Sequence, residues 1–190
     1  MFSDPILKKL VKQYPAPNFV DKSEFLFEEL IESVISQQLS VKASDTIFRR
    51  FNALFKSKIF PKPKEILKMD DEKIRSAGIS YQKISYIKAI AQAFETKQLD
   101  QKKIKNLTNE EIIIELTKIR GIGQWTAEMI LIFTLNRPDV FSIGDLGLRN
   151  AITNLYGITD RKEMLKLSET WAPYRSTASW YLWRSLENKN

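Results

Sequence analysis

The spacing of apolar residues constrains this chain more than any other feature of its sequence. Apolar side chains recur at helical spacing nearly everywhere, whereas the alternation of apolar and polar residues that is typical of half-buried strands is hard to find. Each segment with this pattern can bury one stripe of a helix against its neighbours. We therefore predict an all-α protein.

The predicted helices follow one another closely along the chain. Its 190 residues suffice for one domain, or for two small lobes that share a core, in which the N-terminal residues can rejoin the C-terminal ones. The polar and basic stretch KQLDQKKIKN at 97–106 is interpreted as a linker or a surface turn. Helices are predicted over residues 4–14, 24–38, 41–55, 63–68, 71–76, 81–95, 109–118, 124–135, 146–156, 160–168 and 173–187.

Several of these helices carry recognisable start and stop signals. Thr108 and Glu111 have the spacing of a capping box, in which two side chains satisfy backbone amides reciprocally. Gly78 is placed to end the helix before it, because glycine tolerates the left-handed conformation common at that point. Further N-caps are predicted at Ser23, Ser40 and Asp70.

The composition narrows both the partner and the chemistry. Lysine and arginine number 30 against 23 acidic residues, and the formal net charge of +7 favours a polyanionic partner. Cysteine and histidine are absent, which excludes disulfides, thiolate zinc sites, iron–sulfur clusters and Ser-His-Asp catalysis. Carboxylates, lysine, tyrosine and backbone groups remain as catalysts. The sequence contains neither a signal peptide nor a membrane-spanning stretch, so we expect a soluble cytoplasmic protein.

The stretch RGIGQW places two glycines between the helices predicted at 109–118 and 124–135. Gly121 and Gly123 flank Ile122, which would point inward and fix a tight hairpin. The second helix begins at this turn, so its unpaired N–H groups and positive dipole end can bind a phosphate. The alternative is an ordinary turn, in which the glycines only end the first helix.

Four blocks of sequence together resemble a known family. LTKIRGIGQWTAEMILIFTL at 116–135 and VFSIGDLGLRNAI at 140–152 are similar to the hairpin and catalytic-aspartate block of the helix-hairpin-helix DNA glycosylases. VISQQLSVKAS at 34–44 and WAPYRSTASWYLW at 171–183 resemble the DNA-3-methyladenine glycosylase II branch, which excises alkylated bases. The resemblance implies a compact, two-lobed, all-α domain with a helix-hairpin-helix DNA-binding motif.

This resemblance also divides the chain by role, as a single glycosylase core over residues 1–190. The wedge region is assigned to 34–44, the helix-hairpin-helix motif to 108–135, and the catalytic aspartate and pocket to 140–183. Some relatives carry an additional N-terminal β-domain, for which we expect no room in this chain.

The hairpin would grip the DNA backbone while a damaged nucleotide is flipped out of the duplex. Such contacts to phosphate position a protein without reading the base sequence. In relatives, hairpin carbonyls also hold Na⁺ or K⁺; by position these belong to Thr117, Ile119 and Ile122. The residues assigned to DNA binding at the hairpin are Gly121, Ile122, Gly123, Gln124 and Thr126.

The segment SQQLS at 36–40 is expected to supply the wedge that fills the space left by the flipped nucleotide. Either Gln38 or Leu39 would enter the base stack, and the resemblance does not decide between them. The amides of Gln37 and Gln38 suit the minor groove. Burial in the core is the alternative for Leu39.

Asp145 is the predicted catalytic residue. Its position before a helical run also predicts an N-cap, and in the family one aspartate fills both roles. Breaking the glycosidic bond develops positive charge on the sugar, which an ionised carboxylate stabilises. The same carboxylate could position or deprotonate the attacking water, and the sequence does not separate these roles.

The base pocket is assigned to Trp125, Trp183 and Met129, with core packing as the alternative for each tryptophan. Relatives that cut the strand carry a nucleophilic lysine where this chain has Trp125, so hydrolysis to an abasic site is expected. An indole face suits a cationic alkylated base. Arg175 and Ser176 are expected to support the pocket wall or the start of the last helix.

The leading hypothesis is therefore a monofunctional DNA glycosylase for alkylated purines such as 3-methyladenine and 7-methylguanine. A non-enzymatic helix-hairpin-helix DNA-binding protein would need the glycines but neither Asp145 nor the tryptophans. A glycosylase for oxidised or mismatched bases is the third hypothesis. The expected partner is double-stranded DNA with damaged bases, bound by a monomer that needs no cofactor beyond a possible alkali ion at the hairpin.

Overall fold

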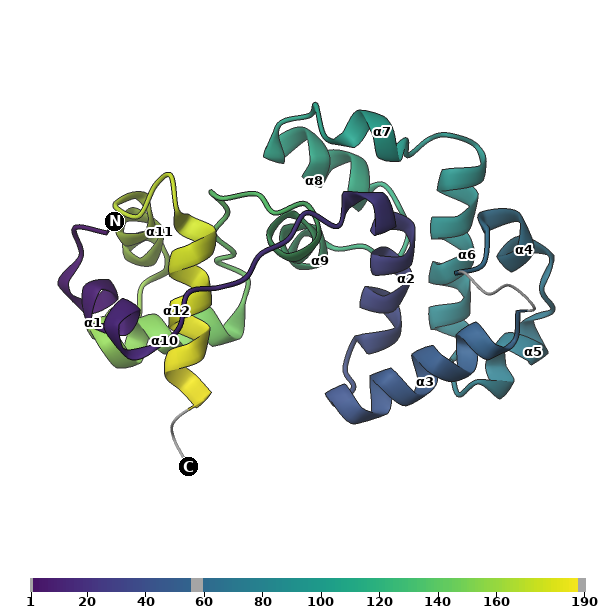
Figure 1. Cartoon of the computed structure of the whole chain (residues 1–190), viewed down its shortest axis with the longest axis horizontal. Helices are drawn as coiled ribbons and strands as arrows, with labels where there is room; N and C mark the ends of the chain where they lie inside the picture. Colours follow the sequence, from purple (N-terminus) through teal and green to yellow (C-terminus); the bar gives the residue numbers. More distant parts are fainter. Residues whose placement is uncertain (1, 56–59, 188–190) are drawn as a thin grey trace. The chain divides into compact units, whose positions relative to one another are not determined.

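The computed structural model describes residues 2–55 and 60–187, and within these ranges the chain is helical with no strand (Figure 1). The predicted core over 1–190 therefore includes some residues outside the described part. The elements are α1 (Pro5–Gln13), a 3-10 turn η1 (Ser23–Phe25), α2 (Leu26–Ser36), α3 (Val41–Ala53), α4 (Pro63–Lys68), α5 (Asp71–Ser76), α6 (Tyr81–Glu95), α7 (Gln101–Ile104), α8 (Asn109–Thr117), α9 (Gln124–Met129), a π-helical turn η2 (Ile130–Thr134), α10 (Leu146–Tyr156), α11 (Arg161–Glu169) and α12 (Arg175–Glu187).

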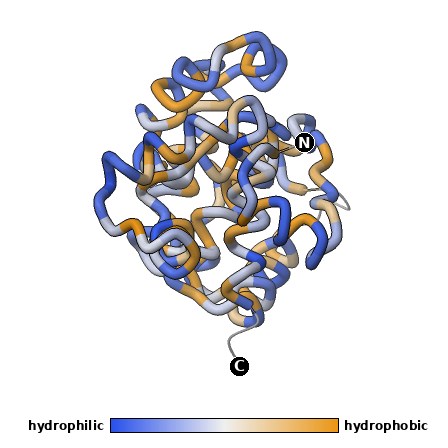
Figure 2. Tube along the Cα trace, turned by 90° about the vertical axis from the view of Figure 1, so that its left-hand side faces the viewer, coloured by the Kyte–Doolittle hydropathy of each residue, from blue (hydrophilic) through white to orange (hydrophobic). Residues whose placement is uncertain are grey.

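The chain forms two compact units. The central unit comprises Lys22–Ile130, and the terminal unit combines Met1–Asp21 with Leu131–Asn190. The prediction of two helical lobes, with the N-terminal residues joining the C-terminal ones, is confirmed. Along the trace in Figure 2, short hydrophobic runs recur between hydrophilic ones, as the sequence pattern requires. In the described part of the chain, no helix combines the length and apolarity needed to cross a membrane.

The core of the central unit lies between α2 and α6, which pack side by side. The two helices run in opposite directions, as two contacts show. Lys83 near the start of α6 bonds to the end of α2, and Phe94 near the end of α6 packs on Phe27 near the start of α2. Their apolar residues at helical spacing are fully buried. These residues are Leu30, Ile31, Val34, Ile84, Ile87, Ile90 and Ala91.

The core of the terminal unit forms where α12 packs against α10 and α1. Trp171 is its largest fully buried side chain. Asp4 connects this core to the start of the chain: Oδ1 accepts the Ile6 and Leu7 amides of α1 and the Tyr156 hydroxyl at 3.0 Å, and Oδ2 accepts Trp171 Nε1 at 3.3 Å. Burial, followed by the charge of Asp4, raises the pKa of Tyr156 far above its ordinary value.

Most of the predicted caps are confirmed. Ser40 and Asp70 accept backbone amides of α3 and α5, Thr108 and Glu111 form the reciprocal capping box, and α5 ends before Gly78 in the left-handed conformation with φ of +96°. Ser23 is wrong as an N-cap, because it is buried inside the 3-10 turn and α2 begins after Phe25 without a side-chain cap.

The prediction that residues 97–106 form a linker or a plain surface turn is also wrong. This stretch contains α7, a helix of 4 residues whose first amides are satisfied by Asp100. Leu99, just before α7, and Ile104, its last residue, are buried. Two apolar anchors in a basic segment thus fold this stretch onto the central unit.

We predict that Asp4→Ala destabilises the terminal unit more than loss of an ordinary cap would. It removes a helix cap and both tertiary hydrogen bonds, so the free energy of unfolding should fall by about 3 kcal/mol. Asp160→Ala is the matched control, because Asp160 caps α11 through Lys162 and Glu163 amides alone; it should cost about 1 kcal/mol. Urea unfolding of both variants measures the difference, and equal losses would show that the bonds to Tyr156 and Trp171 contribute nothing.

Candidate functional site

The glycine hairpin joins α8 to α9 and is built around one buried residue. Ile122 is 4% exposed, and its amide donates to the Ile119 carbonyl at 3.1 Å. Gly121 has φ of +95°, a conformation that glycine adopts without strain. Gly123 is the exposed N-cap of α9. The inward direction of Ile122 and the tight hairpin are confirmed.

Gly121 lies directly against an aromatic ring. A Cβ atom added there would come within 2.3 Å of Tyr86 Cγ, which no real side chain tolerates. The Arg120 guanidinium is 5.9 Å from the centroid of the same ring. At Gly123, by contrast, an added Cβ atom would meet nothing within 4 Å. The two glycines therefore serve different purposes: Gly121 allows close packing, and Gly123 keeps the surface open.

The other residues assigned to DNA binding or to an ion at the hairpin differ in how far their side chains are exposed. Gln124 is exposed, and its amide nitrogen lies 3.0 Å from Glu128 Oε1. Thr126 is only 6% exposed, so its side chain faces the protein interior and any contact with a ligand there would use the backbone. Thr117 and Ile119 belong to the end of α8 and the turn after it. The described residues contain no group of 3 or more His, Cys, Asp or Glu placed to hold a metal.

The loop after α2 lies beside the hairpin. Gln37 donates from Nε2 to the Gly121 carbonyl at 3.2 Å, which joins two segments 84 residues apart. The next residue, Gln38, has φ of +59°, and both Gln38 and Leu39 are exposed, Leu39 by 39%. The structure thus brings the predicted wedge and the predicted phosphate grip together within the central unit. The alternative in which Leu39 is buried in the core is therefore wrong.

Trp125 and Met129 lie four positions apart on α9 and so share one face of that helix. Trp125 is 46% exposed, which is unusual for so large an apolar ring. Met129 is half-buried. The predicted helix then continues as the π-helical turn η2, a form that recurs at functional sites. Simple core packing does not describe Trp125.

Asp145 is the N-cap of α10 in the terminal unit. Its Oδ1 atom accepts the Leu148 amide at 2.8 Å and the Trp183 Nε1 hydrogen at 2.9 Å. A Cβ atom at Gly147 would lie 3.1 Å from Oδ1 and 3.1 Å from Trp183 Cδ1, so glycine there leaves room for this contact. The carboxylate is therefore held at a fixed angle against the indole edge.

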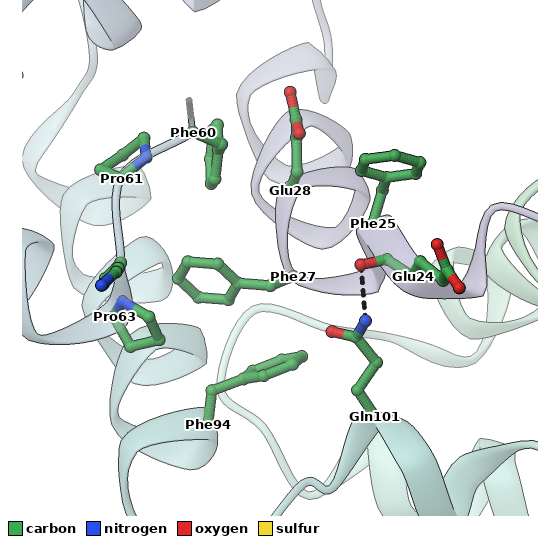
Figure 3. Close-up of a pocket in the computed structure, with 10 residues that line it drawn as sticks. Glu24, Phe25, Phe27, Glu28, Phe60, Pro61, Pro63, Phe94 and Gln101 are labelled. Carbon is green, nitrogen blue, oxygen red and sulfur yellow. Dashed lines mark hydrogen bonds between the residues drawn. The ribbon is translucent and has the colours of Figure 1, made fainter. Parts of the chain in front are cut away.

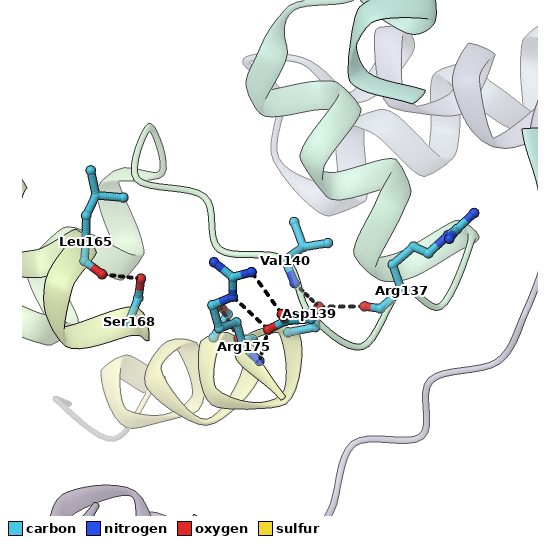
Figure 4. Close-up of polar contacts among 8 residues, drawn as sticks. Arg137, Asp139, Val140, Leu165, Ser168 and Arg175 are labelled. Carbon is cyan, nitrogen blue, oxygen red and sulfur yellow. Dashed lines mark hydrogen bonds and ion pairs between the residues drawn. The ribbon is translucent and has the colours of Figure 1, made fainter. Parts of the chain in front are cut away.

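The loop that carries Asp145 is fastened at both ends. Arg149 donates from NH1 to the carbonyls of Ile143 and Gly144, at 3.0 and 2.7 Å. Further back, Arg175 forms a two-pronged ion pair with Asp139, which lowers the pKa of that carboxyl (Figure 4). Ser176 accepts the Val140 amide and donates to the Arg137 carbonyl. Arg175 and Ser176 thus tie the start of α12 to the loop.

Three residues near Asp145 escaped the sequence analysis. Phe133 is 40% exposed on η2, and its ring lies 5.6 Å from that of Trp183. Gly147 leaves room for the carboxylate, and Arg149 holds the loop that carries it. A glycine in the first turn of a helix is a signal that could have identified Gly147, since glycine there lowers helix stability. Phe133 carried no signal, because an aromatic residue in an apolar run is usually core.

A separate groove of about 360 Å³ lies in the central unit and contains none of the predicted site residues. Figure 3 shows phenylalanine rings facing it from several elements, with Gln101 bonded to the Glu24 carbonyl at its edge. The rings belong to Phe25, Phe27, Phe60 and Phe94.

Comparisons with known proteins show which family this chain is similar to. The model of the HhH-GPD superfamily base excision DNA repair proteins matches residues 31–173. DNA-3-methyladenine glycosylase 1 of Schizosaccharomyces pombe is 44% identical over 183 residues, which cover 94% of this chain and 80% of that protein. A solved structure of 3-methyladenine DNA glycosylase from the same yeast, in complex with abasic DNA, has a TM-score of 0.86 at 41% identity and covers 98% of this chain and 94% of that chain. A DNA-3-methyladenine glycosidase structure from Bacillus halodurans has a TM-score of 0.81 at 34% identity, covering 98% and 91%.

We predict that the two hairpin glycines differ sharply in what they contribute to stability. Gly121→Ala should lower the free energy of unfolding by about 2–4 kcal/mol, since alanine is strained at this φ and would overlap Tyr86. Gly123→Ala, its matched control, should cost less than about 1 kcal/mol. Thermal and urea unfolding measure both. A tolerated Gly121→Ala would mean that Tyr86 does not support the hairpin.

Proposed function

The chain belongs to the HhH-GPD superfamily of base excision DNA repair proteins, and we propose that it is a monofunctional DNA glycosylase that excises alkylated purines by hydrolysis. The observation that carries this proposal is the carboxylate of Asp145, held against Trp183 in a chain that also presents a glycine hairpin for phosphate. A DNA-binding protein without enzymatic activity would need no such arrangement. Relatives named as 3-methyladenine glycosylases support the same activity.

The proposed sequence of events begins with the DNA backbone. Amides of Gly121, Gly123 and their neighbours bind phosphate, and the net charge of +7 favours approach to the duplex. The exposed tip at Gln38 and Leu39 then enters the space left by the extruded nucleotide. Leu39 is the better wedge, because an apolar side chain loses no hydrogen bonds in the base stack.

Asp145 acts on the extruded nucleotide. Its Oδ1 is oriented by the Leu148 amide and the Trp183 indole, so the carboxylate needs no rearrangement when charge develops on the sugar. A carboxylate about 4 Å from that charge, at an effective dielectric constant of about 20, contributes ~4 kcal/mol, or roughly a thousandfold in rate. Water is the nucleophile, and the carboxylate can orient it as the sugar cation forms.

The base is recognised by aromatic faces. Trp183 with Phe133, and Trp125 with Met129, offer electron-rich or polarisable surfaces that attract a cationic alkylpurine. Alkylation at N3 or N7 also weakens the glycosidic bond, so one carboxylate suffices without a strong general acid. Because tryptophan stands where lyase relatives carry an amine, the product is an abasic site.

Three further features complete the proposal. The protein acts as a monomer on double-stranded DNA, in the compartment of the cell that contains the DNA. The carbonyls of Thr117, Ile119 and Ile122 would hold Na⁺ or K⁺, since backbone carbonyl oxygens can replace the hydration shell of such an ion. Ile119 already accepts the Ile122 amide, and a carbonyl oxygen has a second lone pair for such an ion.

We predict that Asp145→Asn abolishes most base release while leaving the fold intact. Asparagine caps helices as well as aspartate does and keeps an oxygen for Leu148 and Trp183, yet it loses the charge, so excision should fall at least a hundredfold. The measurement is release of methylated purines from methylated duplex DNA. Asp160→Asn makes the same change at an exposed cap and should match wild type. Activity of Asp145→Asn within a few-fold of wild type would leave Asp145 as a cap alone.

We predict that Trp125→Ala reduces excision of cationic alkylpurines about tenfold, from the loss of one stacking partner of ~1–3 kcal/mol. Affinity for an abasic-site duplex should change much less, because that ligand has no base to stack. Wild-type protein should give no borohydride-trapped complex with damaged DNA, since borohydride captures imines. A trapped complex would reveal an amine nucleophile elsewhere, and equal losses for both ligands would give Trp125 a purely structural role.

A further inference from the structure

Lys83 lies in the first turn of α6, and its side chain reaches the end of α2. Its Nζ atom donates to the carbonyls of Ile35 and Gln37, both at 2.7 Å. The residue is half-buried, and this burial lowers its pKa. A cation in the first turn is opposed by the dipole of its own helix. The position of Lys83 is therefore explained by the carbonyls that it binds and not by α6 itself.

The Gln37 carbonyl belongs to the peptide bond between Gln37 and Gln38. Gln38 follows with φ of +59°, a left-handed conformation that is uncommon for residues other than glycine and persists only where its surroundings hold it. By binding this carbonyl, Lys83 fixes the orientation of the peptide plane. The backbone twist that exposes Gln38 and Leu39 is thus maintained from α6.

Tyr86 lies one turn after Lys83 on the same helix and packs under the hairpin. Its ring occupies the space that any side chain at Gly121 would need, and Gly121 is itself left-handed with φ of +95°. The bond from Gln37 Nε2 to the Gly121 carbonyl then connects the two loops directly. One turn of α6 therefore supports both left-handed residues of the DNA-binding face.

We propose that Lys83 is a positioning residue for base extrusion, which holds Gln38 and Leu39 at the distance from the glycine hairpin that lets both segments contact the same stretch of duplex. This inference rests on the proposed glycosylase function. The hairpin binds phosphate without Lys83, but a wedge loop that is free to move must first be ordered by the DNA, and that ordering opposes extrusion.

The test is Lys83→Met, which keeps an unbranched chain of similar length and removes every donor. On an alkylated base paired in a duplex, kcat should fall about tenfold with KM nearly unchanged. On the same base opposite an abasic site, where extrusion costs least, the loss should be less than about threefold. Lys83→Arg, which keeps a charged donor, should recover most of the activity. Lys88→Met is the matched control, because Lys88 lies on the same helix and pairs with Asp71; it should behave as wild type.

A second readout does not depend on excision. A duplex with 2-aminopurine opposite an abasic site reports insertion of the wedge, and the fluorescence change at equal occupancy should be smaller for Lys83→Met than for wild type. If wild type releases no alkylated base but this difference is seen, the glycosylase function fails and the positioning role stands. If wild type releases base and Lys83→Met matches it in both readouts, the positioning role fails alone.

Equal losses on the paired and unpaired substrates would also overturn the positioning role, because they would indicate general damage to the fold. Thermal unfolding and affinity for undamaged duplex identify such damage. Should Lys83→Met fail to fold, Lys83→Gln, which retains a shorter uncharged donor, is measured against the same paired and unpaired substrates and the same fluorescence signal.

Discussion

The contact between Gly121 and the Tyr86 ring is the constraint on which the proposed DNA-binding face depends. The ring occupies the space of a side chain, so the hairpin can approach α6 only with glycine at this position. That approach places the Gly121 carbonyl within reach of Gln37, which connects the hairpin to the loop after α2. Moving the hairpin away by the width of one methyl group would disturb both segments, since packed interiors do not absorb such a change.

Asp145 is both a helix cap and the proposed catalytic carboxylate, and catalytic and stabilising roles usually conflict. Catalytic groups are often held in arrangements that lower stability, but this carboxylate, which we propose to be catalytic, caps α10 and so stabilises the fold. The indole of Trp183 donates to the same oxygen, which gives the ring and the carboxylate a fixed relative orientation. Gly147 makes this possible at the cost of a weak helix former in the first turn of α10.

Features set by neighbours in sequence were predictable, and features set by distant contacts were not. The boundaries of α6 and α10 and the capping box at Thr108 follow from local patterns, and the structure reproduces them. The 4-residue helix α7 was missed, because two buried apolar residues, one before the helix and one at its end, determine its fold, and two residues do not make a helical period. The prediction of Ser23 as a cap was wrong, because this residue is buried although serine as a residue type favours the N-cap position.

The candidate site divides in the same way. Asp145 and the glycines were identifiable because each occupies a local position with a chemical meaning, and the resemblance to a family supplied their roles. Lys83 gave no such signal, since a lysine in a helix is normally solvated and its partners lie 46 and 48 residues away. The contact of Trp183 with Asp145 spans 38 residues and is likewise invisible in the sequence.

The terminal unit is assembled from both ends of the chain, with the whole central unit inserted between them. The central unit is synthesised in full before the second segment of the terminal unit, Leu131–Asn190, is made. Helix α1 leaves the ribosome first, yet its packing partner α12 is synthesised last. The hairpin and the loop after α2, to which we assign DNA binding, are therefore synthesised in full before the unit that carries Asp145 is complete.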